Sequence, residues 1–261
     1  MSPENSCGCK GIRFCALCEH TDRVKKLRVE GEKYSAYACY IWDQKSGLCV
    51  KYESIREDTP LEQIQNANAE ICTKNQEITE IDGLMLIHDF ITEEEESMLL
   101  QKIDRVEWIQ SQSGRRKQDY GPQVNFKNKK VKTNKFLGMP DYADMLLEKM
   151  RRYDEIRLGR YVPLEMCNLE YDEERKSAIE MHQDDMWIWG NRLISINLVN
   201  GAVMTLTNDD EKKIVFVVMP RRSLLCMADI CRYKWKHGVL STHIKGRRIA
   251  LTMREAAPAF Q

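Results

Sequence analysis

The sequence predicts an α+β protein with a double-stranded β-helix (jelly-roll) core, flanking helices and a small cysteine-rich N-terminal head. Three features of the 261 residues support this class. Cysteines cluster near the N-terminus, helical patterns begin near residue 92, and short apolar stretches separated by turns fill the C-terminal half. Helices followed by many short strands are typical of α+β proteins with a sandwich or barrel core.

An N-terminal segment, residues 1–80, precedes the predicted jelly-roll domain, residues 81–261. In this segment, β-forming residues flank the stretch DQKSG at 43–47 and predict a hairpin. Residues 53–80 are polar, acidic and only weakly periodic, so we expect a linker there rather than a regular element.

The jelly-roll domain opens with a predicted strand at 83–90 and two predicted helices. Thr92 and Glu95 form a T-x-x-E capping box, which predicts a helix ending near Val106. The pattern DYADMLLEKMRR predicts the second helix at 141–152. Six further apolar stretches bounded by turns predict the remaining strands: 164–171, 178–184, 192–199, 214–219, 223–229 and 247–254.

The composition and the sequence pattern argue against several classes of protein. Lys and Arg number 40, as do Asp and Glu, so the chain is formally neutral and does not resemble a generic nucleic-acid coat protein. No apolar run reaches the roughly 18 residues of a membrane-spanning helix, and the N-terminus has no signal pattern. We therefore expect an intracellular protein, in the cytoplasm and the nucleus, whose ten cysteines stay reduced.

Four of these cysteines, Cys7, Cys9, Cys15 and Cys18, lie within twelve residues. A C-x-x-C pair is a common half of a tetrahedral zinc site, and four thiolates would complete the site. His20 is an alternative ligand, and the other interpretation is a disordered tail whose thiols have no role. A closed four-cysteine site would be structural, or would present a surface to a partner, rather than catalytic.

A second candidate metal site contains His182-Gln-Asp184. His-x-Asp alone is a weak signal, since His20-Thr-Asp22 matches it as well. In a strand, residues two apart point to one face, so both side chains can enter a barrel interior. His237, which follows the apolar strands, can supply a third ligand. Two histidines and one carboxylate are the ligand set of non-haem Fe(II) oxygenases, which leaves open positions on the metal.

Arg248 and Arg254 complete this constellation, because they are six residues apart in one predicted strand and so share a face. Such an iron centre takes a 2-oxo acid as co-substrate, and the distant carboxylate of that acid needs a cationic clamp. Guanidinium stays charged when buried and pairs with carboxylate bidentately. Each residue alone is more often structural, but the joint pattern favours a metal and oxo-acid site.

The region 80–257 resembles the AlkB-type 2-oxoglutarate dioxygenases. The motifs that carry the resemblance are Pro220-Arg221, Arg232-Tyr233-x-Trp235-x-His237 and Arg248-x5-Arg254. The stretches QSGRRKQDYGPQVNF, CNLEY and HQDDMWIWG and the cysteine head are similar to the branch of AlkB homologue four. The resemblance implies a dioxygenase that uses Fe(II), 2-oxoglutarate and O2 to hydroxylate an N-methyl carbon, which leaves as formaldehyde.

The resemblance also implies the roles of the candidate site residues. It assigns the iron to His182, Asp184 and His237. It assigns the distal carboxylate of 2-oxoglutarate to Arg248, with Arg254 bracing the oxo acid and the aspartate ligand.

Two positions depart from the family pattern. Asn168 and Tyr171 correspond to an Asn-x-Tyr pair that contacts the co-substrate, but one extra residue separates them here. Met186 stands two positions after Asp184, where base-repairing relatives carry an acid that faces a flipped base. Repair of classically alkylated bases is therefore disfavoured.

The resemblance implies two substrates: monomethyl-lysine in actin, linked to actomyosin function, as the first, and N6-methyladenine in DNA as the alternative. Asp185, Trp187 and Trp189 suit a methylammonium group, which favours carboxylates and aromatic faces. The other interpretation of these three residues is that they pack the mouth of the barrel. Residues 114–135 carry eight Lys or Arg against one Asp, which suits DNA. That basic stretch would also attract an acidic protein such as actin, or act in nuclear import. The candidate substrate contacts in it are Arg115, Arg116, Tyr120 and Phe126.

Two other classes of protein are alternatives to a 2-oxoglutarate dioxygenase. One is a zinc-headed interaction module built on an inactive barrel, and the other is a cupin-like metalloenzyme without an oxo acid. The presence of all three metal ligands and both arginines argues against the inactive barrel.

Overall fold

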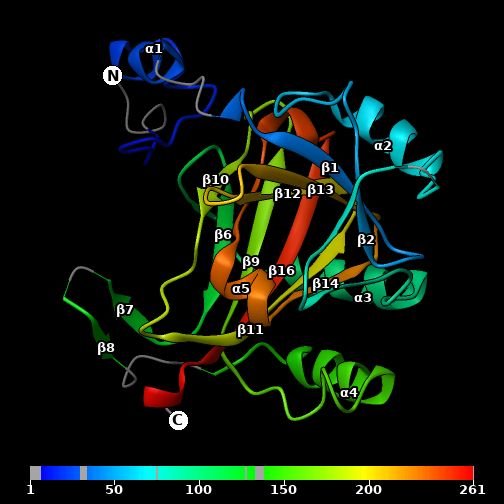
Figure 1. Ribbon diagram of the computed structural model, residues 1–261. Helices are drawn as coiled ribbons and strands as arrows, with labels where there is room; N and C mark the ends of the chain where they lie inside the picture. The colour runs from blue at the N-terminus through cyan, green and yellow to red at the C-terminus, as the bar shows by residue number, and fades with distance from the viewer. Residues whose placement is uncertain (1–6, 30–33, 75, 127, 133–137, 261) are drawn as a thin grey trace.

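Two seven-stranded sheets form the jelly-roll core in a computed structural model of the protein (Figure 1). The structure describes residues 7–29, 34–74, 76–126, 128–132 and 138–260. The first sheet has, in spatial order, β10 (Ile179–His182), β15 (Lys236–Val239), β12 (Ala202–Asn208), β13 (Lys213–Met219), β1 (Ala38–Asp43), β2 (Leu48–Lys51) and β3 (Ile78–Glu80). The second has β4 (Leu84–Ile87), β14 (Leu224–Met227), β11 (Trp189–Leu198), β16 (Arg247–Ala256), β9 (Pro163–Asp172), β6 (Arg116–Tyr120) and β5 (Ile109–Gln110). The predicted fold class is confirmed.

Apolar side chains from both sheets fill the space between them, because alternate residues of each strand face inward. Leu206 and Val215 of the first sheet meet Leu193, Leu225 and Ala250 of the second in one buried cluster. The candidate site lies within this interior, where Arg248 and Asp184 are buried and the His182 side chain is 28% exposed.

Two helices, α3 (Glu93–Ile103) and α4 (Ala143–Tyr153), cover the outer face of the second sheet. The predicted capping box is present at the start of α3, since the Thr92 side chain accepts from the Glu95 N–H and the Glu95 side chain accepts from the Thr92 N–H. Both helices bury one apolar side against the sheet through Leu99, Ile103, Leu146 and Met150.

The stretch 53–80, predicted to be a linker, contains the helix α2 (Leu61–Ala69) and the strand β3. Leu61 and Ile64 lie one turn apart and pack against Ile41 and Phe216 on the outer face of the first sheet. Two buried positions are too short a pattern to reveal a helix in the sequence, although they suffice to dock one.

The boundary predicted after residue 80 does not separate two folding units. β1, β2 and β3 come from the segment before it, and they are strands of the first jelly-roll sheet. β1 pairs in parallel with β13, with Ile41 opposite Phe216. Among the described residues of that segment, the cysteine head and α1 (Asp22–Val29) lie outside the two sheets, at one end of the molecule (Figure 1).

Most predicted elements are present with shifted ends. The hairpin around 43–47 joins β1 and β2, and the strand predicted at 178–184 already ends at His182. The strand predicted at 223–229 is the shorter strand β14, because the helix α5 (Asp229–Lys234) begins where the prediction ended. Elements that were not predicted are the helices α1, α2 and α5, the strands β3, β5, β6, β12 and β15, the hairpin of β7 (Gln123–Asn125) and β8 (Lys130–Lys132), and the short 3-10 turns η4 (Ser241–His243) and η5 (Pro258–Phe260). Within the described part of the chain, no helix is long and apolar enough to cross a membrane.

Candidate active site

His182 and His237 lie directly opposite each other on the neighbouring strands β10 and β15. Their ring centroids are 4.4 Å apart. His182 Nδ1 lies 2.8 Å from the carbonyl oxygen of Glu180, which is an acceptor only, so Nδ1 carries the proton. Nε2 of His182 is then the ring atom with a free lone pair, as a metal ligand requires.

Asp184 lies just beyond the end of β10 rather than within it, so its side chain is not aimed by strand alternation as predicted. Arg254 holds the carboxylate instead, with Nε donating to Oδ2 at 2.8 Å. Arg232 holds the backbone, with Nη2 donating to the Asp184 carbonyl at 3.1 Å. The carboxylate consequently points at the two histidines, and His182 Nε2 lies 3.6 Å from Oδ1.

One ligand atom from each of His182, Asp184 and His237 lies within 4.8 Å of the others, a spacing that suits a single metal ion. Burial would raise the pKa of Asp184, but Arg254 and the two histidines outweigh it, so the pKa lies well below its ordinary value. Burial and the neighbouring His182 lower the pKa of His237 to about 3. The site therefore offers one carboxylate and a neutral imidazole on His237, which are metal-binding forms.

Arg248 lies deeper in the same cavity, on β16, and is buried. Its Nε donates to Asn197 Oδ1 at 2.6 Å, and its guanidinium carbon lies 4.7 Å from the centre of the Tyr171 ring. Neither Nη1 nor Nη2 has a hydrogen-bond partner among the described residues. Two buried, charged donors without an acceptor are costly unless an anionic ligand binds them, and a carboxylate fits their fork geometry. The donor set thus fits both a metal ion and a 2-oxo acid.

Arg254 links the metal end of the cavity to the neighbouring strand β9 of the same sheet. Nη1 donates to Glu165 Oε2 at 2.5 Å, and the guanidinium lies 5.4 Å from the centre of the Trp189 ring. Burial works against its charge, but Asp184 and Glu165 raise the pKa of Arg254 well above the usual value. It therefore stays cationic and keeps Asp184 ionised.

Asn168 and Tyr171 point to opposite faces of β9. Tyr171 lines the cavity beside Arg248, whereas Asn168 is buried toward α4 and donates to Gln118 Oε1 at 2.8 Å and Tyr142 Oη at 2.7 Å. An odd separation in a strand places two residues on different faces. The predicted co-substrate contact of Asn168 is therefore wrong for this chain, and Leu169 takes the cavity position beside Tyr171.

The candidate substrate residues are dispersed. Arg116 pairs with Glu170, and Tyr120 packs among the residues beneath α3 and α4, so both lie away from the cavity. Arg115 is buried with its guanidinium 5.9 Å from the Tyr171 ring centre. These three residues do not line a substrate entrance, contrary to the prediction.

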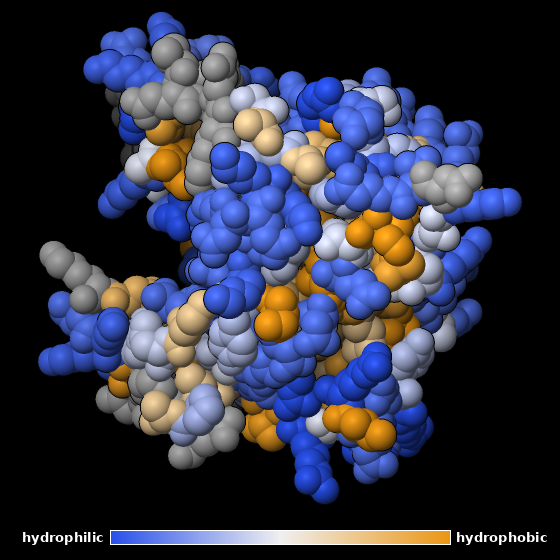
Figure 2. Space-filling view, viewed as in Figure 1, coloured by the Kyte–Doolittle hydropathy of each residue, from blue (hydrophilic) through white to orange (hydrophobic). Residues whose placement is uncertain are grey.

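Asp185 and Trp187 remain near the metal cluster, in the loop after β10. Asp185 is exposed, and Trp187 meets Phe126 edge to face with ring centroids 6.5 Å apart. Phe126 follows β7, so the β7–β8 hairpin reaches this loop (Figure 1). The surface is recessed between this hairpin and the cysteine head (Figure 2).

Three residues that hold the site were not singled out from the sequence: Asn197, Glu165 and the buried Arg232 in its role as a backbone clamp. Asn197 interrupts the apolar stretch ISINLV of β11, which is the only local signal for it. Its amide donates to three backbone carbonyl groups, of Asn200, Met219 and Pro220, so its oxygen is fixed toward Arg248.

The jelly-roll fold and this cluster define a 2-oxoglutarate- and Fe(II)-dependent oxygenase. The structure of OsALKBH1 has the same fold, with a TM-score of 0.53 over 68% of this chain and 98% of that chain at 12% sequence identity. No protein-family model matches the sequence.

Two relatives place the chain more narrowly. It is 62% identical to a DNA N6-methyl adenine demethylase of Caenorhabditis elegans over 99% of this chain and 89% of the relative. It is 34% identical to the alpha-ketoglutarate-dependent dioxygenase alkB homolog 4 of Homo sapiens over 97% of this chain and 87% of the relative. The chain therefore belongs to the AlkB family of Fe(II)- and 2-oxoglutarate-dependent dioxygenases, and is a demethylase of the AlkB type.

Proposed function

We propose that the protein removes the methyl group of N6-methyladenine in DNA, with Fe(II), 2-oxoglutarate and O2. His182, Asp184 and His237 would hold the iron, and Arg248 the distal carboxylate of 2-oxoglutarate. When bound, the iron and its co-substrate supply the oxidising power that hydroxylates the methyl carbon, after which formaldehyde leaves. The observation that carries the choice of DNA is the exposed ring of Phe126, which lies in the turn of the lysine-bearing β7–β8 hairpin and contacts Trp187 near the metal cluster.

The protein's own residues supply position rather than bond-making. The Glu180 carbonyl fixes the His182 tautomer, and Arg254 keeps the Asp184 carboxylate charged and aimed at the histidines. Asn197 and the Tyr171 ring fix the Arg248 guanidinium, so the co-substrate meets a preorganised clamp. The apolar cavity walls, such as Leu193 and Met204, exclude water from the reacting groups.

The hairpin suits a nucleic acid in charge and in shape. Lys129, Lys130 and Lys132 are exposed, and none of them forms an ion pair with another described residue. Phe126 is 49% exposed and contacts Trp187. Lysines that are not neutralised within the protein suit phosphates, and exposed aromatic rings suit bases that leave the stack.

The name of the Caenorhabditis elegans relative, a DNA N6-methyl adenine demethylase, supports the same substrate. This relative favours DNA as the substrate, whereas the sequence analysis placed monomethyl-lysine of actin first and DNA second. Actin as a substrate stays a prediction without support from the relatives.

A parallel incubation tests the proposal. Iron-loaded protein with 2-oxoglutarate is given a duplex containing N6-methyladenine or an actin peptide containing monomethyl-lysine, and loss of methyl is read by mass. We expect adenine from the duplex and an unchanged peptide, with no reaction in Asp184→Ala. Demethylated peptide with an unchanged duplex would overturn the choice of DNA.

The hairpin is tested with a matched pair of triple variants. Replacing Lys129, Lys130 and Lys132 by Ala should lower the slope of log affinity against log salt for DNA by up to about 3, one for each phosphate contact. The control replaces three exposed lysines outside the hairpin, Lys45, Lys74 and Lys212. Equal salt slopes in the two triple variants would contradict a role of the hairpin in DNA binding.

A further inference from the structure

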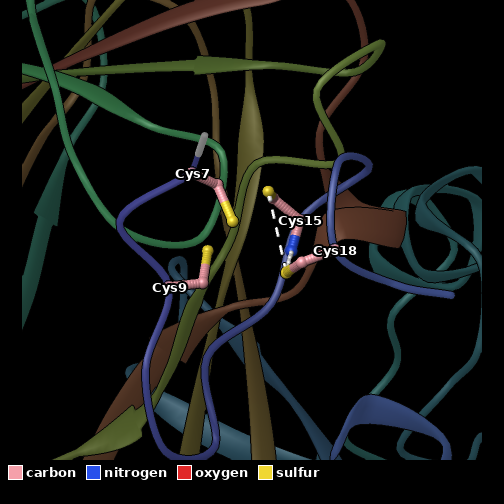
Figure 3. Close-up of side chains that lie close together, drawn as sticks. All are labelled: Cys7, Cys9, Cys15 and Cys18. Carbon is pink, nitrogen blue, oxygen red and sulfur yellow. Dashed lines mark hydrogen bonds between the residues drawn. The ribbon is translucent and has the colours of Figure 1, made fainter. Parts of the chain in front are cut away.

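The four cysteines of the head converge on one point (Figure 3). Cys7 and Cys9 approach from one segment and Cys15 and Cys18 from the next, and their sulfur atoms all lie within 4.8 Å of one another. The Sγ atoms of Cys15 and Cys18 are 4.0 Å apart. In a tetrahedral site with zinc–sulfur bonds of about 2.3 Å, sulfur atoms lie about 3.8 Å apart. We propose that these four cysteines bind one zinc ion as thiolates and so hold the head against the barrel edge beside His182.

The competing uses of the cysteines fit less well. All four are free, and 4.0 Å between Cys15 and Cys18 is about twice the length of a disulfide bond. In an iron–sulfur cluster each thiolate binds a separate iron atom, which spreads the sulfur atoms further than around one ion. His20, the alternative ligand, has a side chain that is 86% exposed, so it lies outside the cluster.

The head depends on these sulfur atoms for its interior. Its buried cluster consists of Cys15, Cys18 and Val24, with Cys7, Cys9 and Phe14 packed against it. Among the described side chains of this cluster, four of the six are thus the proposed ligands, and one valine with one phenylalanine adds little apolar surface to order the segment. Small units of this kind are held together by a structural metal.

Hydrogen-bond donors reach two of the four sulfur atoms and so offset part of the negative charge of a four-thiolate site. The backbone N–H of Cys15 donates to Cys18 Sγ at 3.4 Å, and Arg23 Nη2 donates to the same sulfur at 3.6 Å. The third donor comes from the barrel: the Ser113 N–H donates to Cys9 Sγ at 3.2 Å. Cys9, a proposed zinc ligand, therefore accepts a hydrogen bond directly from the jelly-roll domain.

Further contacts fasten the head to the loops beside β6 and β10. The Ala16 N–H donates to the Arg175 carbonyl at 3.3 Å, and Lys176 pairs with Glu19 at 2.7 Å. Arg13 lies 3.8 Å from Glu180.

The loops that the head contacts lead into the candidate active site. The backbone carbonyl of Glu180 is the partner of His182 Nδ1. Two residues after Ser113 comes Arg115, whose guanidinium lies near the Tyr171 ring. The same ring lies beside Arg248. Zinc in the head would thus stabilise the edge that positions both a metal ligand and the co-substrate clamp.

Metal analysis of the full chain tests the site. We expect one zinc per chain in the wild type and in a variant with His182→Ala and His237→Ala, which removes the iron ligands only. Cys15→Ser should lose the zinc, whereas Cys72→Ser, an exposed cysteine outside the cluster, should retain it. Absence of zinc from the wild type, iron in its place, or full zinc content in Cys15→Ser would overturn the proposal.

Cobalt substitution keeps the test valid if Cys15→Ser fails to fold. Co(II) bound by thiolates gives sulfur-to-metal charge-transfer absorption, which the His182, Asp184 and His237 cluster cannot produce. We expect that absorption, with the intense visible bands of tetrahedral Co(II), in cobalt-loaded wild type. Its absence would overturn four-thiolate binding.

Hydrogen exchange of the full chain, with zinc and after its removal by a chelator, tests the stabilised edge. We expect loss of protection at residues 111–115 and 178–182, with α4 unchanged as the internal control. Unchanged exchange in both segments would contradict the claim that zinc in the head stabilises this edge. An equal loss of protection in α4 would contradict it too, because zinc would then stabilise the whole fold.

Discussion

Arg248 donates from Nε to Asn197 Oδ1 at 2.6 Å, which leaves both of its Nη groups without a partner among the described residues. Asn197 is itself held by three backbone carbonyl groups. The fork of the guanidinium is therefore fixed in direction before any ligand arrives. Preorganisation of this kind lowers the cost of binding a carboxylate.

Replacing Arg248 by Lys should raise KM for 2-oxoglutarate about tenfold or more, because an ammonium group cannot form the bidentate pair. The measurement is succinate formation at varied 2-oxoglutarate. Arg247→Lys is the matched control, since Arg247 is the next residue but pairs with Asp104 and Glu170 on the other face. A normal KM in Arg248→Lys would show that the clamp lies elsewhere.

Arg254→Gln should weaken iron binding by about 10- to 100-fold, since Asp184 loses the partner that orients it and keeps it ionised. Iron titration of the apoprotein measures this. Glu165→Gln removes the other partner of Arg254 but keeps the pair with Asp184, so its effect should be smaller. Equal iron affinity in Arg254→Gln and the wild type would contradict the role given to Arg254.

Tyr171 and Asn168 should respond differently to truncation. Tyr171→Ala should raise KM for 2-oxoglutarate, because the ring supports Arg248. Asn168→Ala should leave that KM unchanged but lower the free energy of unfolding by about 1–3 kcal/mol, because Gln118 and Tyr142 lose a buried partner. Denaturant unfolding and initial rates separate the two effects, and a raised KM in Asn168→Ala alone would reverse the assignment.

Glu170 should give the protein an acid-sensitive step in stability. Burial would raise its pKa, but Arg116 and Arg247 outweigh burial and lower it from 4.5. A depressed pKa in the folded state contributes stability above the ordinary pKa, and this contribution is lost as pH falls through the folded value. Unfolding should therefore become easier below about pH 4.5.

Glu170→Gln isolates this contribution. It should destabilise the protein at neutral pH by about 3 kcal/mol, because it leaves a cluster of arginines without their shared carboxylate. It should also flatten the acid limb of the stability curve measured in denaturant. A wild-type acid limb in this variant would place the sensitivity at another carboxylate.

Local and short-range signals in the sequence predicted their structures well. The capping box at Thr92 and the hairpin around 43–47 depend on neighbouring residues, and both are present. The predicted ligands His182, Asp184 and His237 come together because antiparallel pairing of β10 and β15 sets two of them opposite each other. The spacing of Arg248 and Arg254 placed both in the cavity for the same reason of strand geometry.

Features set by distant packing could not be predicted in this way. α2 exists because Leu61 and Ile64 find the outer face of a sheet that is formed by residues far along the chain. Asn197 can hold Arg248 because the carbonyl groups of Met219 and Pro220, more than twenty positions along the chain, fix its amide group. Asp184 is aimed by Arg254 from 70 positions away rather than by its own strand.

The most direct test of the account is a mole-for-mole measurement on one duplex containing N6-methyladenine. Adenine, formaldehyde and succinate are quantified together for the wild type and for Asp184→Ala. We expect equal amounts of the three products from the wild type and none of them from Asp184→Ala, which should still bind the duplex through the hairpin lysines. Succinate without adenine from the wild type, or adenine from Asp184→Ala, would contradict it.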